Sequence, residues 1–189
     1  MRQPLIAGNW KMNGLIADAK ALAAGLKKEL AAHSGSPEIL VCPPFLSLAA
    51  VRDELQGSPI RLGAQDLHWE AKGAFTGEVS TAMLKDVGCT AVLIGHSERR
   101  HIMGESNEQV NKKLKAALAA GLLPVVCIGE LLEERSMGVT REVVERQISK
   151  GLEGLSAEDA AKTVIAYEPV WAIGTGKTAT PRQAQEVHH

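Results

Sequence analysis

The sequence predicts an α/β protein in which parallel strands alternate with helices. Short apolar runs alternate along the chain with longer runs that have the apolar spacing of amphipathic helices. The apolar runs are continuous rather than alternating in polarity, which is typical of strands covered on both faces of a parallel sheet. A strand-then-helix repeat of this kind implies right-handed crossovers between parallel strands.

The elements follow one another in six units, beginning with the brief apolar run LIAGNW. We expect strands at Leu5–Trp10, Glu38–Pro44, Ile60–Leu67, Ala91–His96, Leu122–Glu130 and Lys162–Pro169. We expect helices at Ala17–His33, Leu46–Leu55, Thr81–Gly88, Asn107–Gly121, Thr140–Leu152 and from Pro181 onward. The first helix is rich in Ala, Leu, Lys and Glu, and prolines end the second strand. Glycine ends the fourth helix, Thr140 is available as an N-cap, and Pro181 suits a first helical turn.

Two architectures are compatible with this order, an open doubly wound sheet and a (β/α)8 barrel. A barrel needs eight units and typically about 250 residues, whereas this chain has 189. The pattern alone does not separate the two. At this length we expect a single domain over residues 1–189, large enough to bury a substantial core.

Composition excludes several classes of function. The net charge is -1 and the sequence pI is about 6.6, which gives no electrostatic reason to expect binding to nucleic acid or to an anionic membrane. No apolar run is long enough for a transmembrane helix, and the N-terminal sequence lacks a signal-peptide pattern. Cys42, Cys89 and Cys127 form no C-x-x-C motif and lie in or beside apolar segments, so we expect buried free thiols in a reducing cytoplasm.

Polar residues of catalytic types follow the ends of the predicted strands. Asn9 and Lys11 follow the first strand, His96 the fourth, and Glu168 ends the sixth. The carboxyl ends of parallel strands share one face, where ligands bind in α/β folds, so these side chains should converge. Each also has an ordinary interpretation: a solvated lysine, a core histidine and a surface carboxylate.

The short sequence after His96 favours a chemical role for the histidine. "HSERR" opens a helical turn, and a helix N-terminus favours a neutral imidazole that can donate a hydrogen bond to a substrate oxygen. Glu168 stands beside a glycine-rich loop, whose closure would desolvate the carboxylate and raise its basicity, as a general base requires. Arg99, Arg100 and Glu105 are expected to form an ion-paired scaffold.

The loop "YEPVWAIGTGKTATP" contains glycines that could suggest a nucleotide site. A P-loop requires glycine at the position of Trp171, so that motif fails. A dinucleotide fingerprint places its glycines directly between the strand and the helix start. Here Pro169, Val170 and Trp171 intervene between the end of the strand and Gly174, so this motif fails too. A long loop of small residues after a strand is better interpreted as a mobile lid.

Five motifs together resemble one family. They are AGNWKMN (Ala7–Asn13), GAFTGEVS (Gly73–Ser80), IGHSERR (Ile94–Arg100), CIGE (Cys127–Glu130) and AYEPVWAIGTGKTATP (Ala166–Pro181). In this order and spacing they resemble the triosephosphate isomerase family along the whole chain. The resemblance implies a TIM barrel, of which the chain covers about the first six units. It also implies interconversion of dihydroxyacetone phosphate and D-glyceraldehyde 3-phosphate, in glycolysis and gluconeogenesis, without metal or organic cofactor.

The resemblance also implies roles for individual residues. Glu168 matches the base that moves a proton between neighbouring carbons, and His96 matches the neutral electrophile at the substrate oxygens. Lys11 matches the cation that offsets developing negative charge, and Asn9 a substrate-contacting amide. Gly174 lies in the loop whose backbone N–H meets the phosphate.

Two further residues complete the family pattern. Glu98 matches a supporting carboxylate beside the histidine. The loop Gly73–Ser80 matches the segment that projects into a partner subunit, where Thr76 would approach the neighbouring site, which implies a homodimer.

The family pattern continues for two more βα units that have no match here. Those units carry a serine and a Gly-Gly pair that complete the phosphate pocket. We therefore expect a truncated gene product, a fragment, or an incomplete sequence of a longer enzyme; another barrel enzyme acting on a phosphorylated sugar is a further alternative. An intact mass near 20.1 kDa would exclude the incomplete sequence, and we then expect little activity and poor solubility.

Overall fold

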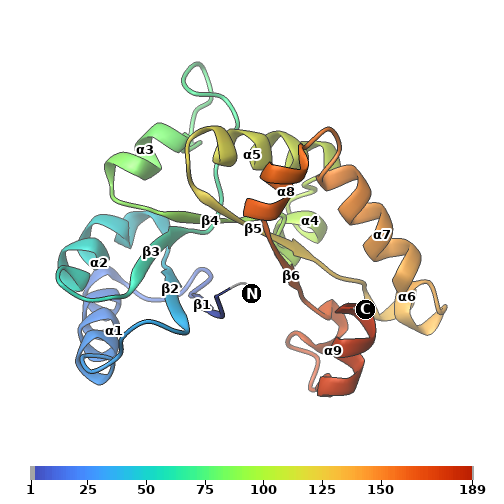
Figure 1. Ribbon diagram of the computed structural model, residues 1–189, viewed down its shortest axis with the longest axis horizontal. Helices are drawn as coiled ribbons and strands as arrows, with labels where there is room; N and C mark the ends of the chain where they lie inside the picture. Colours follow the sequence, from blue (N-terminus) through green and yellow to red (C-terminus); the bar gives the residue numbers. More distant parts are fainter. Residues whose placement is uncertain (1–2, 189) are drawn as a thin grey trace. The chain divides into compact units, whose positions relative to one another are not determined.

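The computed structural model describes residues 3–188, which form two compact units that are best considered separately. The first unit comprises residues 3–93 and 116–123, and the second comprises residues 94–115 and 124–188. Strands and helices alternate along the chain in both units (Figure 1). Among the described residues, no helix has both the length and the apolarity needed to cross a bilayer.

The first unit contains a parallel sheet in chain order. Its elements are β1 (Leu5–Asn9), α1 (Ile16–Glu29), β2 (Glu38–Cys42), the 3₁₀ helix η1 (Phe45–Ser47), α2 (Leu48–Leu55), β3 (Arg61–Ala64), α3 (Thr81–Asp86) and β4 (Ala91–Ile94). β2 pairs with β1 and with β3, and β3 pairs with β4, all in parallel. The doubly wound orders would separate β2 from β3 or β3 from β4, so this pairing excludes them.

The remaining elements lie in the second unit, except for the end of α5 and Leu123 of β5, which belong to the first unit. They are α4 (Ser97–His101), α5 (Asn107–Ala119), β5 (Leu123–Ile128), α6 (Leu132–Ser136), α7 (Thr140–Gly151), α8 (Ala157–Lys162), β6 (Val164–Tyr167), the 3₁₀ helix η2 (Val170–Ala172) and α9 (Pro181–His188). β5 and β6 pair in parallel, with Val125 opposite Val164 and Ile128 opposite Tyr167. The predicted α/β class with parallel strands is confirmed in each unit.

Several predicted boundaries were wrong, and each has a local cause. The fourth strand ends at Ile94 instead of His96, because Gly95 has φ 69° and turns the chain so that His96 caps α4. Thr140 is not an N-cap: Val139 holds that position, and the Thr140 hydroxyl lies 3.5 Å from Glu130 Oε1. The short helices α6 and α8, of five and six residues, were not predicted.

Burial differs between the strands. β4 is buried throughout and β5 in all but its first residue, whereas β6 is half-buried at every position and Ile6 in β1 is 59% exposed. β1 and β6, the first and last strands of the series, are therefore less covered than β4 and β5. The predicted buried free thiols are confirmed, since Cys42, Cys89 and Cys127 are all buried and unbridged.

Gly63 in β3 gives a direct test of packing in the first unit. A Cβ at this position would lie 2.8 Å from Cys42 Sγ and 3.0 Å from Leu40 Cδ1. Gly63→Ala should therefore lower the free energy of unfolding by about 1–3 kcal/mol, the usual cost of overpacking, as measured by urea denaturation. Gly25→Ala in α1 is the matched control: its Cβ meets nothing within 4 Å, so it should stabilise by about 0.5–1 kcal/mol. The packing argument fails if both substitutions act in the same direction.

Candidate active site

In the first unit, one side chain ties together the carboxyl ends of three strands. Gln65 follows β3, and its Nε2 donates to the carbonyl oxygen of Lys11 and to that of Cys42, both at 2.8 Å. Cys42 ends β2, while Asn9 ends β1 and accepts the Lys11 N–H on Oδ1 at 2.9 Å. The predicted residues Asn9 and Lys11 therefore lie in one hydrogen-bonded network at the strand ends.

The backbone of Lys11 has an unusual conformation. Its φ is 54°, in the left-handed region that non-glycine residues seldom adopt. Such a residue costs about 1–3 kcal/mol and persists only where its surroundings hold it. Here Asn9 Oδ1 fixes the Lys11 N–H, and Gln65 fixes the Lys11 carbonyl. A strained, half-buried lysine held from both sides is a candidate functional residue rather than an ordinary surface lysine.

In the second unit, His96 begins α4 in a defined orientation. Its Nδ1 accepts the backbone N–H of Glu98 at 3.3 Å. The Glu98 carboxylate lies on the same side of the ring, 3.5 Å from Nδ1, and is 41% exposed. The amide contact is the shorter one, and an amide can donate only to an unprotonated nitrogen, so we assign the ring proton of the neutral imidazole to Nε2.

The Nε2 side of the same ring faces Glu168. Nε2 lies 3.2 Å from Glu168 Oε1, with side-chain exposures of 9% and 24% for the histidine and the glutamate. His96 follows β4 and Glu168 follows β6, so residues 72 positions apart meet at the carboxyl ends of strands, as the sequence predicted. A carboxylate that can accept a proton and an N–H that can donate a hydrogen bond therefore stand side by side in a largely buried setting.

A fully buried carboxylate anchors the start of the loop that was predicted to be a lid. Glu130 has no exposed side-chain area, and its oxygens accept hydrogen bonds from Arg135 at 2.9 Å, Trp171 Nε1 at 3.0 Å and the Tyr167 hydroxyl at 2.9 Å. The Arg135 guanidinium also lies over the Trp171 ring, 4.8 Å from its centroid. A buried charge is tolerated only when it is paired and hydrogen-bonded, and Glu130 is both.

The lid beyond Trp171 is exposed and rich in glycine. Gly174 and Gly176 have φ of 66° and 75°, and a Cβ at either position would meet nothing within 4 Å. The Thr175 hydroxyl donates to the Trp171 carbonyl at 2.6 Å, which closes a tight turn. Gly174, the predicted phosphate-contacting residue, thus lies on an open loop that follows the firmly held Trp171.

The remaining predicted residues lie on separate segments. Thr76 is exposed in the loop before α3, where the neighbouring Phe75 packs on His68 with ring centroids 4.4 Å apart. The predicted pair of Arg99 and Glu105 is confirmed at 2.9 Å. Arg100 donates to backbone carbonyls, with Nε 2.7 Å from the oxygen of Gly95.

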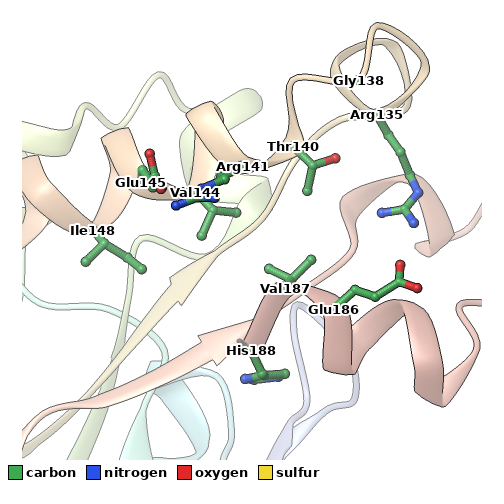
Figure 2. Close-up of a pocket in the computed structure, with 10 residues that line it drawn as sticks. All are labelled: Arg135, Gly138, Thr140, Arg141, Val144, Glu145, Ile148, Glu186, Val187 and His188. Carbon is green, nitrogen blue, oxygen red and sulfur yellow. Dashed lines mark hydrogen bonds and ion pairs between the residues drawn. The ribbon is translucent and has the colours of Figure 1, made fainter.

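A cavity of about 880 Å³ lies in the second unit away from these residues. Helices α6, α7 and α9 line it, and Val187 of α9 points toward α7, where Val144 and Ile148 lie (Figure 2). Arg141 and Glu145 on its wall pair with each other at 2.6 Å. None of the predicted site residues lines this cavity, so we do not assign the chemistry to it.

Sequence reasoning missed Glu130 as an anchor and Gln147 as a buried polar residue. Gln147 falls on the buried stripe of α7 with Val143, Val144 and Gly151. The sequence signal that could have identified Gln147 was its position as a single amide within an otherwise apolar stripe of the helix.

Burial of three acidic groups predicts sensitivity to alkali. Burial raises the pKa of the Cys89 thiol and of the Cys127 thiol from 9.0 to about 12. Burial, together with a hydrogen bond to Glu130, raises the pKa of Tyr167 from 10.0 to about 12. The unfolded chain loses these protons at lower pH than the folded chain, so their stabilising contribution is complete below pH 9 and is lost between pH 9 and about 12.

Urea unfolding at about pH 8 and about pH 10.5 measures this loss of stability. Cys89→Ala should reduce the difference between the two denaturation midpoints, because it removes one of the three groups. Equal midpoints at the two pH values would contradict the prediction.

Comparison with known proteins places this chain in a family. Residues 4–189 match the family model described as triosephosphate isomerase. The chain is 59% identical over 188 residues to a triosephosphate isomerase of Endomicrobium trichonymphae, covering 100% of this chain and 75% of that protein. It is 56% identical over 187 residues to the protein of that name from Carboxydothermus hydrogenoformans, covering 99% of this chain and 74% of the relative. The chain therefore spans about three quarters of the length of these relatives.

Proposed function

Because this chain belongs to the triosephosphate isomerase family, we propose that it interconverts dihydroxyacetone phosphate and D-glyceraldehyde 3-phosphate, a step shared by glycolysis and gluconeogenesis in the cytoplasm. The observation that carries the proposal is the 3.2 Å contact between His96 Nε2 and Glu168 Oε1. It pairs a base with a hydrogen-bond donor, which is the combination needed to move a proton next to a carbonyl group.

In the proposed reaction, the Glu168 carboxylate removes a proton from the carbon beside the substrate carbonyl. The electron pair of the broken C–H bond forms a C=C bond, and the carbonyl oxygen becomes an enediolate oxygen. Return of the proton to the neighbouring carbon, with transfer of the hydroxyl proton between the two oxygens, gives the isomeric product. Glu168 ends the cycle ionised, so no oxidant or cofactor enters the balance.

His96 acts on the oxygens in this proposal. Its Nδ1 accepts from the Glu98 amide, which leaves Nε2–H to donate where negative charge develops. A donor fixed in advance is worth most in a site with little water. The direct contact of Nε2 with Glu168 would give way to the substrate, whose carbonyl group would lie between the two side chains.

Lys11 and Asn9 supply the remaining polar groups. The Lys11 ammonium would offset the charge of the phosphate and of the enediolate, and its strained backbone supports such a role because strain of this kind clusters at functional sites. The Asn9 side chain holds the Lys11 N–H and would contact the substrate. The backbone N–H of Gly174 would meet the phosphate when the lid closes and excludes water, a type of motion for which this family is the standard example.

The test is to follow conversion of dihydroxyacetone phosphate by proton NMR in D₂O. The protein is purified from its natural source, and its intact mass is measured to establish which chain is being assayed. We expect product that carries deuterium on the carbon that receives the proton, because a carboxylate base exchanges its proton with solvent. Absence of conversion by the folded protein would reject the proposed function, and conversion without any deuterium would contradict a base whose proton exchanges with solvent.

We also propose that the protein forms a homodimer through the loop Gly73–Ser80. The exposed Thr76 and the 41% exposed Phe75 on this loop support the proposal. Sedimentation equilibrium should give twice the chain mass, and Thr76→Arg should shift the equilibrium toward monomer. A monomer at micromolar concentration would contradict it.

A further inference from the structure

The backbone beside the proposed base is packed against a glycine. Gly129 follows β5, and a Cβ built on it would overlap the carbonyl oxygen of Glu168 and lie 2.8 Å from the carbonyl carbon of that residue. The Glu168 N–H donates to the carbonyl oxygen of Ile128 at 2.8 Å. The peptide groups on both sides of Glu168 Cα are therefore in contact with the end of β5.

Gln147 of α7 holds this strand end in place. Its Oε1 accepts the Gly129 N–H at 2.8 Å, and its Nε2 donates to the Gly129 carbonyl at 3.0 Å. The oxygen and the nitrogen of the Gln147 side-chain amide thus both hydrogen-bond to Gly129, and Gln147 is only 6% exposed. This arrangement continues the hydrogen bonding beyond β5, whose last residue is Ile128.

We propose that Gln147 is a positioning residue for Glu168: its amide fixes Gly129, and Gly129, lacking a Cβ, sets where the backbone of Glu168 lies. Gln147 touches no reacting atom and acts through the strand end. The inference rests on the proposed function for its kinetic consequence but not for its geometry.

The consequence is kinetic because a base must be placed accurately. Misplacement of a catalytic group by about 1 Å can cost about 10²-fold in rate. Loss of the two bonds from Gln147 would free Gly129 to move away from the Glu168 carbonyl. The base and His96 would then lose their fixed distance, while the proposed substrate contacts from Lys11 and Gly174 come from other segments.

The experiment compares Gln147→Met with the unchanged protein. Methionine has a similar length but makes neither hydrogen bond, so we expect kcat to fall by at least about tenfold and KM to change by less than about twofold. A second readout needs no turnover: the ¹⁵N chemical shift of His96 Nε2, which lies 3.2 Å from Glu168 Oε1, should move. If Gln147→Met does not fold, Gln147→Glu takes its place, since it keeps an acceptor for the Gly129 N–H and loses the donor in its ionised form.

Asn111 provides a matched control in the same unit. Its Nδ2 also makes two bonds to backbone, to the carbonyls of Gly151 and Glu153, each at 2.9 Å. Asn111→Leu should lower the melting temperature and leave both kcat and the His96 shift unchanged.

The outcomes separate the inference from the proposed function. The positioning role would be overturned if folded Gln147→Met had a normal kcat and an unchanged ¹⁵N chemical shift of His96 Nε2. It would be overturned even if the melting temperature of that variant fell. If the unchanged protein fails to isomerise, the proposed function fails, and the His96 shift alone then decides the positioning role.

Discussion

Glu168→Gln should lower kcat for triose phosphate isomerisation by about 10²- to 10⁴-fold, the range that general-base catalysis contributes. An amide cannot take a proton from carbon, yet its carbonyl oxygen can still accept the His96 Nε2–H that now lies 3.2 Å from Glu168 Oε1. The substitution therefore removes the base while keeping the shape and the main hydrogen bond of the site. Initial rates at saturating substrate measure the loss, and deuterium incorporation into product should fall with the rate.

The control for Glu168→Gln is Glu145→Gln on α7. Glu145 is 61% exposed and pairs with Arg141 at 2.6 Å. An exposed pair of this kind contributes little to stability, so both kcat and the melting temperature should stay near those of the unchanged protein. Near-normal turnover by Glu168→Gln would show that another group is the base.

His96→Asn should lower kcat by about 10²- to 10³-fold, the usual cost of removing one donor at a developing oxyanion. The choice of asparagine separates two roles of the histidine. Asparagine is a good N-cap, so it can accept the Glu98 N–H in place of Nδ1 and keep α4 intact. Its shorter side chain cannot reach the place of Nε2, so the donor is lost.

The measurement for His96→Asn is kcat together with the melting temperature. We expect the rate to fall and the melting temperature to stay within a few degrees. His101→Asn, on the exposed end of the same helix, is the control and should change neither quantity. If His96→Asn lost stability and activity together, while its folded fraction turned over normally, the histidine would be only a structural cap.

Part of the site was predictable because it follows from strand order. His96 and Glu168 in the second unit, like Asn9 and Lys11 in the first, stand directly after apolar runs, and within each unit the carboxyl ends of parallel strands bring such positions together. The contact of His96 with Glu168 is the clearest example, since no local pattern connects these two residues. The α/β class was equally predictable, because continuous apolar runs separated by amphipathic stretches are compatible with few other folds.

Other features could not be deduced from the sequence because they depend on partners distant in the chain. Glu130 is fully buried, yet its partners Tyr167 and Trp171 come from a segment about forty residues later. The role of Gly129 depends on how closely the backbone of Glu168 approaches, which no local motif encodes. The positive φ of Lys11 likewise has no local signal, because lysine is not a residue that favours this conformation.

The hydrogen bond between Trp171 and Glu130 also makes the start of this loop observable by fluorescence. An indole whose N–H meets a buried carboxylate, and whose ring lies under a guanidinium, has an emission spectrum set by that environment. The sequence contains three tryptophans, at positions 10, 69 and 171. With Trp10 and Trp69 replaced by phenylalanine, the fluorescence of the remaining indole would report the surroundings of Trp171 alone, in real time and without an added dye.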